Sequence, residues 1–369
     1  MYLQHLSLDN FKNYSQAGLD FCDKINCLVG NNGSGKTNLL DAIHYLSFCK
    51  SYFNLIDTQN IKHDHDFFAI HGTYIRNGRH HDEIDCIQQR NQKKVFRLNK
   101  KTYSRLADHI GLYPLVMVSP YDRDLINEGS EIRRKYVDSV ISQFDKAYLD
   151  DLINYNKALM QRNTLLRQFA ESRSFDRASL EIWDEQLVML GKKIFECRQR
   201  FFEAFTPIFS QYFEFISVGR EKVGIVYESH LLEGDFREML NQYIDRDLSL
   251  GFTGTGIHKD DLSFLIDNYP AKKYGSQGQQ KSFVTALKLA QFDYTRDIKG
   301  FKPLILFDDI FDKLDEIRVK QIVKLVAHDN FGQVFITDTE KNRINAIFTG
   351  LDIDCKIFEV SNGYVTEIK

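Results

Sequence analysis

One segment of eight residues, positions 30–37, constrains this chain more than any other. It reads Gly-Asn-Asn-Gly-Ser-Gly-Lys-Thr, which fits the phosphate-binding loop pattern of a glycine, four free positions and then Gly-Lys-Thr. The glycines allow positive φ angles and let backbone N–H groups approach phosphate oxygens without a Cβ in the way. In this pattern Lys36 contacts the β- and γ-phosphates, and the Thr37 hydroxyl can ligate Mg²⁺. The segment therefore predicts a nucleoside triphosphate site with Mg²⁺.

The segments on either side of the loop support this prediction. Residues 25–29 read as a short buried strand, and residues 38–43 open an amphipathic helix whose N-terminus would face the anion. Because the loop stands between a strand and a helix, a chance match is a poor explanation. The residues expected to contact the nucleotide in this part of the chain are Gly30, Asn31, Asn32, Gly33, Ser34, Gly35, Lys36, Thr37 and Asn38.

Composition places the chain among globular proteins. It has 369 residues, enough for two domains or one large domain with an insertion, and 43% of them are hydrophobic. The net charge of −3 means that any surface for nucleic acid must be local. The sequence shows no basic-then-apolar leader and no apolar run near the ~20 residues that cross a bilayer. Its six cysteines form no Cys-x-x-Cys pair, so we expect reduced thiols in a cytoplasmic protein.

Strand-like patterns dominate the first part of the chain. Two β-like runs, residues 67–75 and 81–87, are joined by Asn77-Gly78, a strong hairpin signal. With a third run at residues 94–98 they predict a small antiparallel sheet, and residues 2–8 read as an edge strand. Several histidines lie in this region without a ligand pattern, and exposed hairpin histidines are the better interpretation than a metal site.

Helical patterns follow at residues 131–219. Apolar residues recur there at steps of three, four and seven, which is typical of helices packed as an antiparallel hairpin. We expect the turn of this hairpin at residues 173–177, and Pro207 to end or kink the second helix. The positions expected in the seam are Leu152, Leu159, Leu166, Leu180, Trp183, Leu187, Leu190, Ile194, Cys197 and Phe201.

Two basic segments are candidates for contact with DNA. Residues 93–105 interleave six basic residues with two aromatic ones, as a phosphate-backbone contact would. A solvated strand edge protected by lysines explains the same pattern equally well. Residues 133–135 (Arg-Arg-Lys) are the second candidate.

Two further segments in the last third of the chain suit nucleotide chemistry. An apolar strand at residues 304–307 delivers Asp308 and Asp309 at its C-terminal end, the edge of a parallel sheet where ligands bind. Asp308 suits Mg²⁺, and Asp309 suits the orientation of an attacking water. Residues 274–281 precede a helix expected from residue 282, where Ser276 and backbone N–H groups could hold phosphate. Taken alone, this second segment reads better as an ordinary capped helix start.

The order of these three segments resembles the ABC-type ATPase heads of the structural-maintenance-of-chromosomes group. Ser276-Gln277-Gly278-Gln279 stands where that group has its Ser-Gly-Gly-Gln signature, and Leu314-Asp315 matches the end of its D-loop. The chain is more closely similar to the bacterial RecF family of that group. The supporting segments are residues 8–14, 30–38, 119–120, 133–134, 258–262, 276–281 and 308–309.

The resemblance implies an α/β fold: a P-loop ABC-type head with a mixed sheet and an antiparallel β-subdomain, plus a helical arm without a long coiled coil. We expect the head to comprise residues 1–115 and 246–369, and the arm residues 116–245. Lys36, Asp308, Asp309 and, from the partner protomer, Ser276 would be catalytic. Ser276, Gln277, Gly278 and Gln279 would complete the ATP site, and Thr37 and Asp308 would hold Mg²⁺.

The resemblance also implies a function. An ATP-dependent homodimer would bind single-stranded, gapped and duplex DNA and, with RecR- and RecO-like mediators, help to load a recombinase in DNA repair, replication and the SOS response. Hydrolysis would be stimulated by DNA, and it would be slow because Asp309 replaces the usual, longer glutamate. Ile336-Thr337-Asp338-Thr339 occupies the place of the usual histidine, so no γ-phosphate sensor is assigned. The alternatives are a structural head that bridges DNA without a mediator role and a P-loop kinase-like NTPase.

Overall fold

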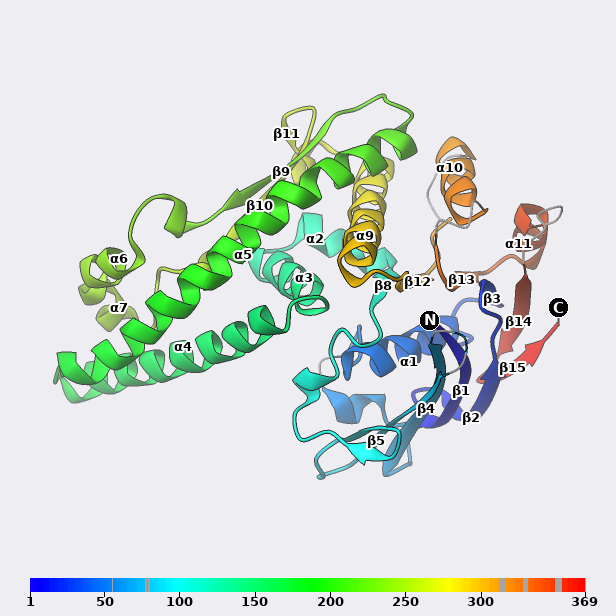
Figure 1. The fold of residues 1–369 in the computed structure, drawn as a ribbon, viewed down its shortest axis with the longest axis horizontal. Coiled ribbons are helices and arrows are strands. Elements are labelled where there is room, and N and C mark those ends of the chain that lie inside the picture. Colours follow the sequence, from blue (N-terminus) through cyan, green and yellow to red (C-terminus); the bar gives the residue numbers. More distant parts are fainter. Residues whose placement is uncertain are drawn as a thin grey trace. The chain divides into compact units, whose positions relative to one another are not determined.

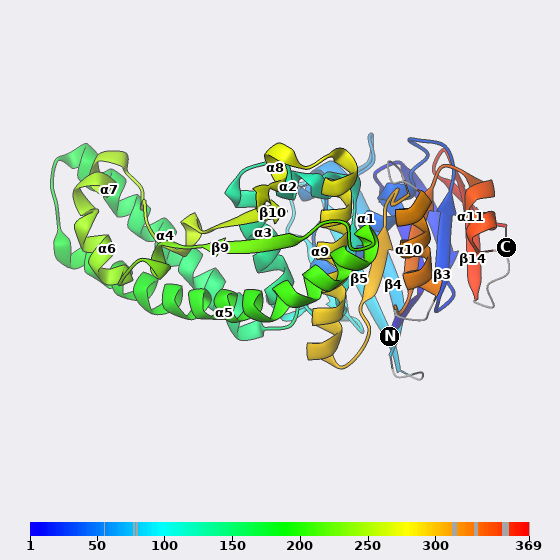
Figure 2. The ribbon, with the colours of Figure 1, turned by 90° about the horizontal axis from the view of Figure 1, so that it is seen from above.

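The structure is a computed structural model of the chain. It describes all residues except Leu55, Asn77, Arg79, 312–315, 328–330, 349–353 and Lys369. The chain forms two compact units (Figures 1 and 2). Unit 1 comprises Met1–Arg123, Phe215–Gly219 and Gln277–Lys369, and unit 2 comprises Asp124–Glu214 and Arg220–Ser276. Each unit therefore contains segments that are far apart in the sequence.

The first sheet of unit 1 is largely parallel and carries the phosphate loop. Its strand order is β15-β14-β3-β13-β12-β8, in which only the pair β14–β15 is antiparallel. Every residue of β3, β8, β12 and β13 is buried, because such strands are covered on both faces. The strands are β3 (Ile25–Val29), β8 (Leu115–Val118), β12 (Leu304–Phe307), β13 (Val334–Asp338), β14 (Cys355–Ser361) and β15 (Tyr364–Glu367).

The second sheet of unit 1 is antiparallel throughout. Its order is β2-β1-β4-β5-β6-β7, so β1 lies inside the sheet and is not the edge strand that the sequence suggested. The expected hairpin of β4 and β5 is confirmed by a register that pairs Arg76 with His80, although Asn77 lies outside the described residues. The strands are β1 (Tyr2–Phe11), β2 (Tyr14–Asp20), β4 (Phe67–Arg76), β5 (His80–Gln89), β6 (Val95–Leu98) and β7 (Lys101–Thr102).

One cluster of buried side chains joins both sheets of unit 1 to its first helix. α1 (Lys36–Phe48) contributes most of its residues to this core, including Leu39 and Ile43. The other helices of unit 1 are α9 (Gln277–Lys299), α10 (Glu316–Ala327) and α11 (Lys341–Phe348). α9 begins five positions earlier than the expected Ser282, so the Gln277-Gly278-Gln279 segment is its first turn.

Unit 2 contains the helices and a three-stranded antiparallel sheet of order β11-β10-β9. Its two long helices, α4 and α5, follow one another as a hairpin (Figure 1). Buried hydrogen bonds link them, including one from Arg162 Nε to Asp184 Oδ1 at 2.6 Å. The elements are α2 (Asp124–Asn127), α3 (Ser130–Ser142), α4 (Lys146–Ser172), α5 (Arg177–Ser217), α6 (Phe236–Gln242), α7 (Ile244–Leu250), α8 (Ala271–Tyr274), β9 (Val223–Glu228), β10 (Asp261–Ile266) and β11 (Tyr269–Pro270).

Unit 2 differs from the sequence prediction in two details. Of the two effects expected of Pro207, an end and a kink, the end is wrong, because α5 continues to Ser217 and buries Phe205, Phe209 and Phe213 on either side of the proline. The kink stays a prediction. The burial of those rings outweighs the one backbone hydrogen bond that a proline removes. In α4 the buried residues are Tyr148, Tyr155, Ala158, Arg162 and Leu166, whereas Leu152 and Leu159 are only partly buried.

The boundaries of the units also differ from the expected domain limits of 115 and 245. The first boundary falls after Arg123, and the second after Ser276. The later position has a local cause, because β10 pairs with β9 and Asp261 at its start binds Arg133 of α3 with an Nε–Oδ1 distance of 2.6 Å. Residues 246–276 therefore lie in unit 2.

Candidate nucleotide-binding site

The phosphate loop connects β3 to α1, as the sequence predicts. Gly35 precedes α1 with φ 117°, and a Cβ there would lie 2.4 Å from Asn13 Nδ2 and 2.7 Å from the Tyr14 hydroxyl. At Gly30 a Cβ would lie 2.2 Å from the carbonyl oxygen of Val360. Glycine is therefore required at both positions by close approach of the surrounding chain.

The polar groups of the loop fit an anion. Lys36 is 5% exposed, and its ammonium donates to the carbonyl oxygens of Gly30 at 2.7 Å and Asn31 at 3.0 Å. Burial lowers the pKa of this ammonium, and the nearby Asp309, Asp308 and Asp338 oppose the shift. The Ser34 hydroxyl is buried without a hydrogen-bond partner among the described residues. A cation and an unsatisfied hydroxyl in a glycine-lined cradle suit a phosphate group.

A cavity of about 320 Å³ lies beside the loop. The β14–β15 hairpin forms one wall of it through Glu359, Ser361 and Asn362, and Lys341 contributes from the start of α11. Polar and charged groups of the C-terminal hairpin thus lie beside residues 30–34. The sequence analysis had assigned no residue of that hairpin to the site.

Asp308 and Thr37 meet directly, as the sequence predicts for a metal-binding pair. The Thr37 hydroxyl donates to Asp308 Oδ1 at 2.9 Å, with Oδ2 at 3.1 Å. The Thr337 hydroxyl of β13 donates to the same Oδ1 at 2.8 Å. Burial raises the pKa of Asp308 to about 6, against the opposing effect of the two threonine hydroxyls. A hydroxyl and a desolvated carboxylate are oxygen ligands that fit Mg²⁺.

Asp309 has an unusual backbone conformation. Its φ is 45°, which a residue with a side chain adopts only when its surroundings hold it there. Two contacts hold it: its N–H donates to Thr337 Oγ1 at 2.9 Å, and its carbonyl oxygen accepts from Lys281 Nζ at 3.1 Å. Lys281 lies in α9, so the helix that begins with the signature segment is fastened to the end of β12.

The signature segment spans the boundary of the two units. Ser276 is the last residue of unit 2 and is exposed, and Gln277, Gly278 and Gln279 form the first turn of α9 in unit 1. The segment is therefore the start of α9 itself and not a turn that precedes the helix. Leu314-Asp315, which match the end of a D-loop, lie outside the described residues.

Three residues of the site were missed as functional candidates by the sequence analysis. The Tyr14 hydroxyl donates to the Gly35 carbonyl oxygen at 3.0 Å, and Asn13 Nδ2 donates to the Ser34 carbonyl oxygen at 3.1 Å. Thr337 joins the two aspartates, as described above. Asn13 and Tyr14 lie in the 8–14 motif, which was a signal without an assigned role. Thr337 was visible only as a departure from the usual histidine.

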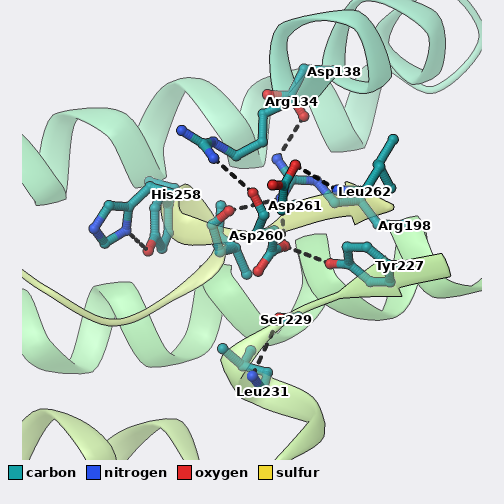
Figure 3. A network of polar contacts seen from close by, with 12 residues as sticks. Arg134, Asp138, Arg198, Tyr227, Ser229, Leu231, His258, Asp260, Asp261 and Leu262 are labelled. Carbon is teal, nitrogen blue, oxygen red and sulfur yellow. Dashed lines mark hydrogen bonds and ion pairs between the residues drawn. The ribbon is translucent and has the colours of Figure 1, made fainter. Parts of the chain in front are cut away.

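The structure argues against DNA contact by residues 133–134 and by Lys94 of the segment 93–105. Lys94 is held internally by Cys49 O at 2.6 Å and Asp57 Oδ2 at 2.7 Å, although Lys93, Lys100 and Lys101 are exposed. In unit 2, Arg134 Nη1 donates to the Asp260 carbonyl oxygen at 2.7 Å, within a network centred on Arg198 (Figure 3). The arginines at 133 and 134 thus serve the interior of unit 2 through ion pairs and backbone contacts.

Three expectations from the sequence concern a metal cluster, disulfides and membrane helices. Within it, no three histidine, cysteine or acidic side chains are grouped so that they could hold a metal ion. None of the six cysteines, all of which the structure describes, forms a disulfide. Of the helices that the structure describes, none is long and apolar enough to cross a membrane.

The chain is similar to known proteins over nearly its whole length. The family described as RecF/RecN/SMC N terminal domain matches residues 2–364. The DNA replication and repair protein RecF of Flavobacterium johnsoniae is 53% identical over 98% of this chain and 100% of its own length. That of Bacteroides thetaiotaomicron is 50% identical over 100% and 99%.

Solved structures show the same similarity. A structure described as the recombination mediator protein RecF–ATP in the RecFOR pathway has a TM-score of 0.89 and 31% identity, covering 100% of this chain and 98% of that one. An Smc head domain from Pyrococcus furiosus has a TM-score of 0.59 at 18% identity, over 100% and 96% of the two chains, which supports the fold alone. The expected ABC-type head fold, with a mixed sheet and an antiparallel β-subdomain, is confirmed.

Proposed function

The chain belongs to the family of RecF DNA replication and repair proteins, within the RecF/RecN/SMC group, and from this premise we propose that it is an ATP-driven recombination mediator. It binds ATP, dimerises, holds DNA and helps to load a recombinase on single strands during repair, replication and the SOS response. The observation that carries the proposal is the contact of Thr37 with Asp308 at 2.9 Å beside the glycine cradle. That contact joins the phosphate loop to an aspartate that lies 271 residues later in the sequence, at the end of β12.

Residues of the loop and of the end of β12 have different roles in the site. Residues 30–38 hold the phosphates through backbone N–H groups, and Lys36 balances their charge. Thr37 and Asp308 would hold Mg²⁺, whose charge would offset that of the phosphate oxygens. Asp309 orients the attacking water. Because Asp309 is one methylene shorter than glutamate, turnover is slow, and hydrolysis serves as a switch that DNA stimulates.

A second protomer completes the site. Ser276 with the first turn of α9 faces the nucleotide held by the partner's phosphate loop, so ATP drives dimerisation. The ATP-bound dimer holds single-stranded, gapped or duplex DNA by its backbone, and hydrolysis releases it. Unit 1 is the ATPase head and unit 2 the arm in this arrangement. RecR- and RecO-like mediators are the proposed protein partners, because a similar structure is described within the RecFOR pathway.

Mixing two inactive variants tests whether the site is shared between protomers. Lys36→Ala removes the phosphate contact of one protomer's loop, and Ser276→Arg blocks the signature turn with a bulky charge. Each variant alone should remain monomeric in the presence of ATP and should hydrolyse almost no ATP. The mixture should form dimers, because each mixed dimer has one site made of an intact loop and an intact turn.

The readouts are sedimentation and ATP hydrolysis, with each variant at the total concentration of the mixture as control. Recovery of dimers and of up to about half of the wild-type hydrolysis per dimer supports the sandwich. A mixture that behaves as the sum of its components contradicts it and favours a kinase-like site complete within one protomer. Ser276→Ala is the matched small substitution, which should keep ATP binding by the monomer.

A further inference from the structure

A continuous line of polar contacts among buried and partly buried residues links α1 with α9 inside unit 1. It begins at the helix that follows the phosphate loop and ends at the helix that opens with the signature segment. No residue of it was singled out by the sequence analysis. We call it the α1–α9 relay; its members are Asp41, Ser51, Tyr52, Asp122 and Lys288.

Asp41 fastens the relay to α1. It is fully buried five residues after Lys36, and its carboxylate accepts from the Ser51 hydroxyl at 2.7 Å and from the Tyr52 N–H at 2.7 Å. Lys12 pairs with the same carboxylate at 2.6 Å. A displacement of α1 therefore moves the Ser51-Tyr52 segment with it, since a buried carboxylate cannot give up these partners cheaply.

Tyr52 carries the connection to α9. Its hydroxyl donates to Asp122 Oδ1, and Lys288 Nζ pairs with the same oxygen at 2.9 Å and reaches the Tyr52 hydroxyl at 3.3 Å. The side chains of Asp122 and Lys288 are 3% and 5% exposed. Three polar groups thus meet at one point away from water, where each depends on the other two.

Asp122 also fixes the segment that leaves β8. Its Oδ2 accepts from the Ser119 N–H at 2.7 Å, which shapes the turn after the strand. The next residue, Arg123, donates from Nη2 to Gln280 Oε1 at 3.2 Å in the first turn of α9. The relay thus reaches α9 twice, at its start through Gln280 and two turns further on through Lys288.

We propose that Tyr52 is a positioning residue that makes the placement of α9 depend on the state of the phosphate loop. The inference rests on the proposed function, in which ATP drives dimerisation through the first turn of α9. The two carboxylates, Asp41 and Asp122, are balanced by Lys12 and Lys288, so the relay keeps its charge pairing only when both helices hold one relative arrangement. Nucleotide at the loop selects that arrangement, and α9 then presents the signature turn to the partner.

Tyr52→Phe tests the relay by removing one hydroxyl. The ring keeps its packing against His44 and Phe53, so the fold should survive. Tyr121→Phe is the matched control, because Tyr121 packs on the same Phe53 but is 64% exposed and lies outside the relay. For Tyr52→Phe we expect unchanged ATP affinity of the monomer and ATP-driven dimerisation weakened about tenfold, the loss typical of one hydrogen bond to a charged group.

The measurements are ATP binding at protein concentrations where the chain is monomeric, and sedimentation at saturating ATP. If Tyr52 had a purely structural role, Tyr52→Phe would lower the unfolding temperature, the ATP affinity of the monomer and the strength of dimerisation together. Equal dimerisation of Tyr52→Phe and Tyr121→Phe, with a wild type that dimerises, overturns the relay but leaves the proposed function intact. A wild type that stays monomeric with ATP overturns the proposed function, and the relay with it.

A double-mutant cycle gives a second test that does not depend on one variant. Lys288→Met keeps a long unbranched side chain, one atom shorter, and removes the charged ammonium. If both residues act through the relay, the double variant Tyr52→Phe/Lys288→Met should dimerise no more weakly than the worse single variant. Effects of the two substitutions that simply multiply would contradict the relay.

Discussion

Replacing Thr337 with valine should disturb both aspartates of the site at once. The side chain is fully buried, donates to Asp308 Oδ1 at 2.8 Å and accepts from the Asp309 N–H at 2.9 Å. Valine has nearly the same shape but forms neither bond. Loss of a hydrogen bond to a carboxylate costs about 1.5–3 kcal/mol, and a buried N–H without an acceptor costs about 1–3 kcal/mol. We therefore expect the free energy of unfolding of Thr337→Val to be lower than that of the wild type by roughly 3 kcal/mol.

Thr337→Ser is the discriminating control. It keeps the hydroxyl and loses only a methyl group, which costs about 1 kcal/mol. If hydrogen bonding governs the position, serine is better tolerated than valine; if apolar packing governs it, valine is better tolerated. The assay is thermal unfolding by circular dichroism together with hydrogen exchange of peptides that contain β12 and β13.

Hydrolysis should follow the same order. Without Thr337, Asp308 loses a donor that holds its pKa down, so its pKa rises further above about 6. A protonated Asp308 is a poor cation ligand, and the acidic limb of the pH–rate profile should move to higher pH in Thr337→Val. Equal stability, equal hydrolysis and equal pH profiles of the valine and serine variants would refute this reasoning.

Two further predictions concern stability. Arg162→Met should destabilise unit 2 by about 3–5 kcal/mol, because it removes a guanidinium that lies 2.6 Å from both Asp184 and Asp247. The buried Asp247 then loses its ion pair, and the buried Asp184 keeps only Arg177 at 3.9 Å. The single tryptophan, Trp183, follows this unfolding in urea, and an unchanged midpoint would contradict it. Stability should also fall from pH 6.5 to pH 4, by at most about 3 kcal/mol per buried histidine, because the unfolded chain binds protons there that the folded chain does not. Burial lowers the pKa to about 4 in His44, His109 and His258. A flat stability profile over that range, or one unaltered by His109→Gln, would contradict this second prediction.

The sequence was most informative where one chemical task dictates local residues. The phosphate loop needs glycines at fixed spacing, and β3 appears over the predicted residues 25–29. Asp308 was predicted beside Thr37 because strands of a parallel sheet end at one edge, and the two side chains are in contact. The β4–β5 hairpin likewise follows from local turn chemistry.

Long-range pairing was beyond such patterns. Of the leucines of α4 that suggested the buried stripe, Leu166 is buried, but Tyr148, Tyr155 and Arg162 take other places in it. The arginine can be buried because Asp184 and Asp247 from elsewhere in the chain neutralise it. Likewise the sequence suggested that Lys94 is a surface cation, whereas its ammonium binds the Cys49 carbonyl oxygen and the Asp57 carboxylate. A charged residue in a sequence does not reveal whether a partner distant in the chain will bury it.

The most direct test of the account is sedimentation of the wild-type chain with Mg²⁺ under three conditions: no nucleotide, ADP and a non-hydrolysable ATP analogue, each with and without duplex DNA. We predict a dimer only with the ATP analogue, and tighter retention of DNA by that dimer. A monomer under every condition would contradict the shared site and would leave the segment around Ser276 as an ordinary helix start.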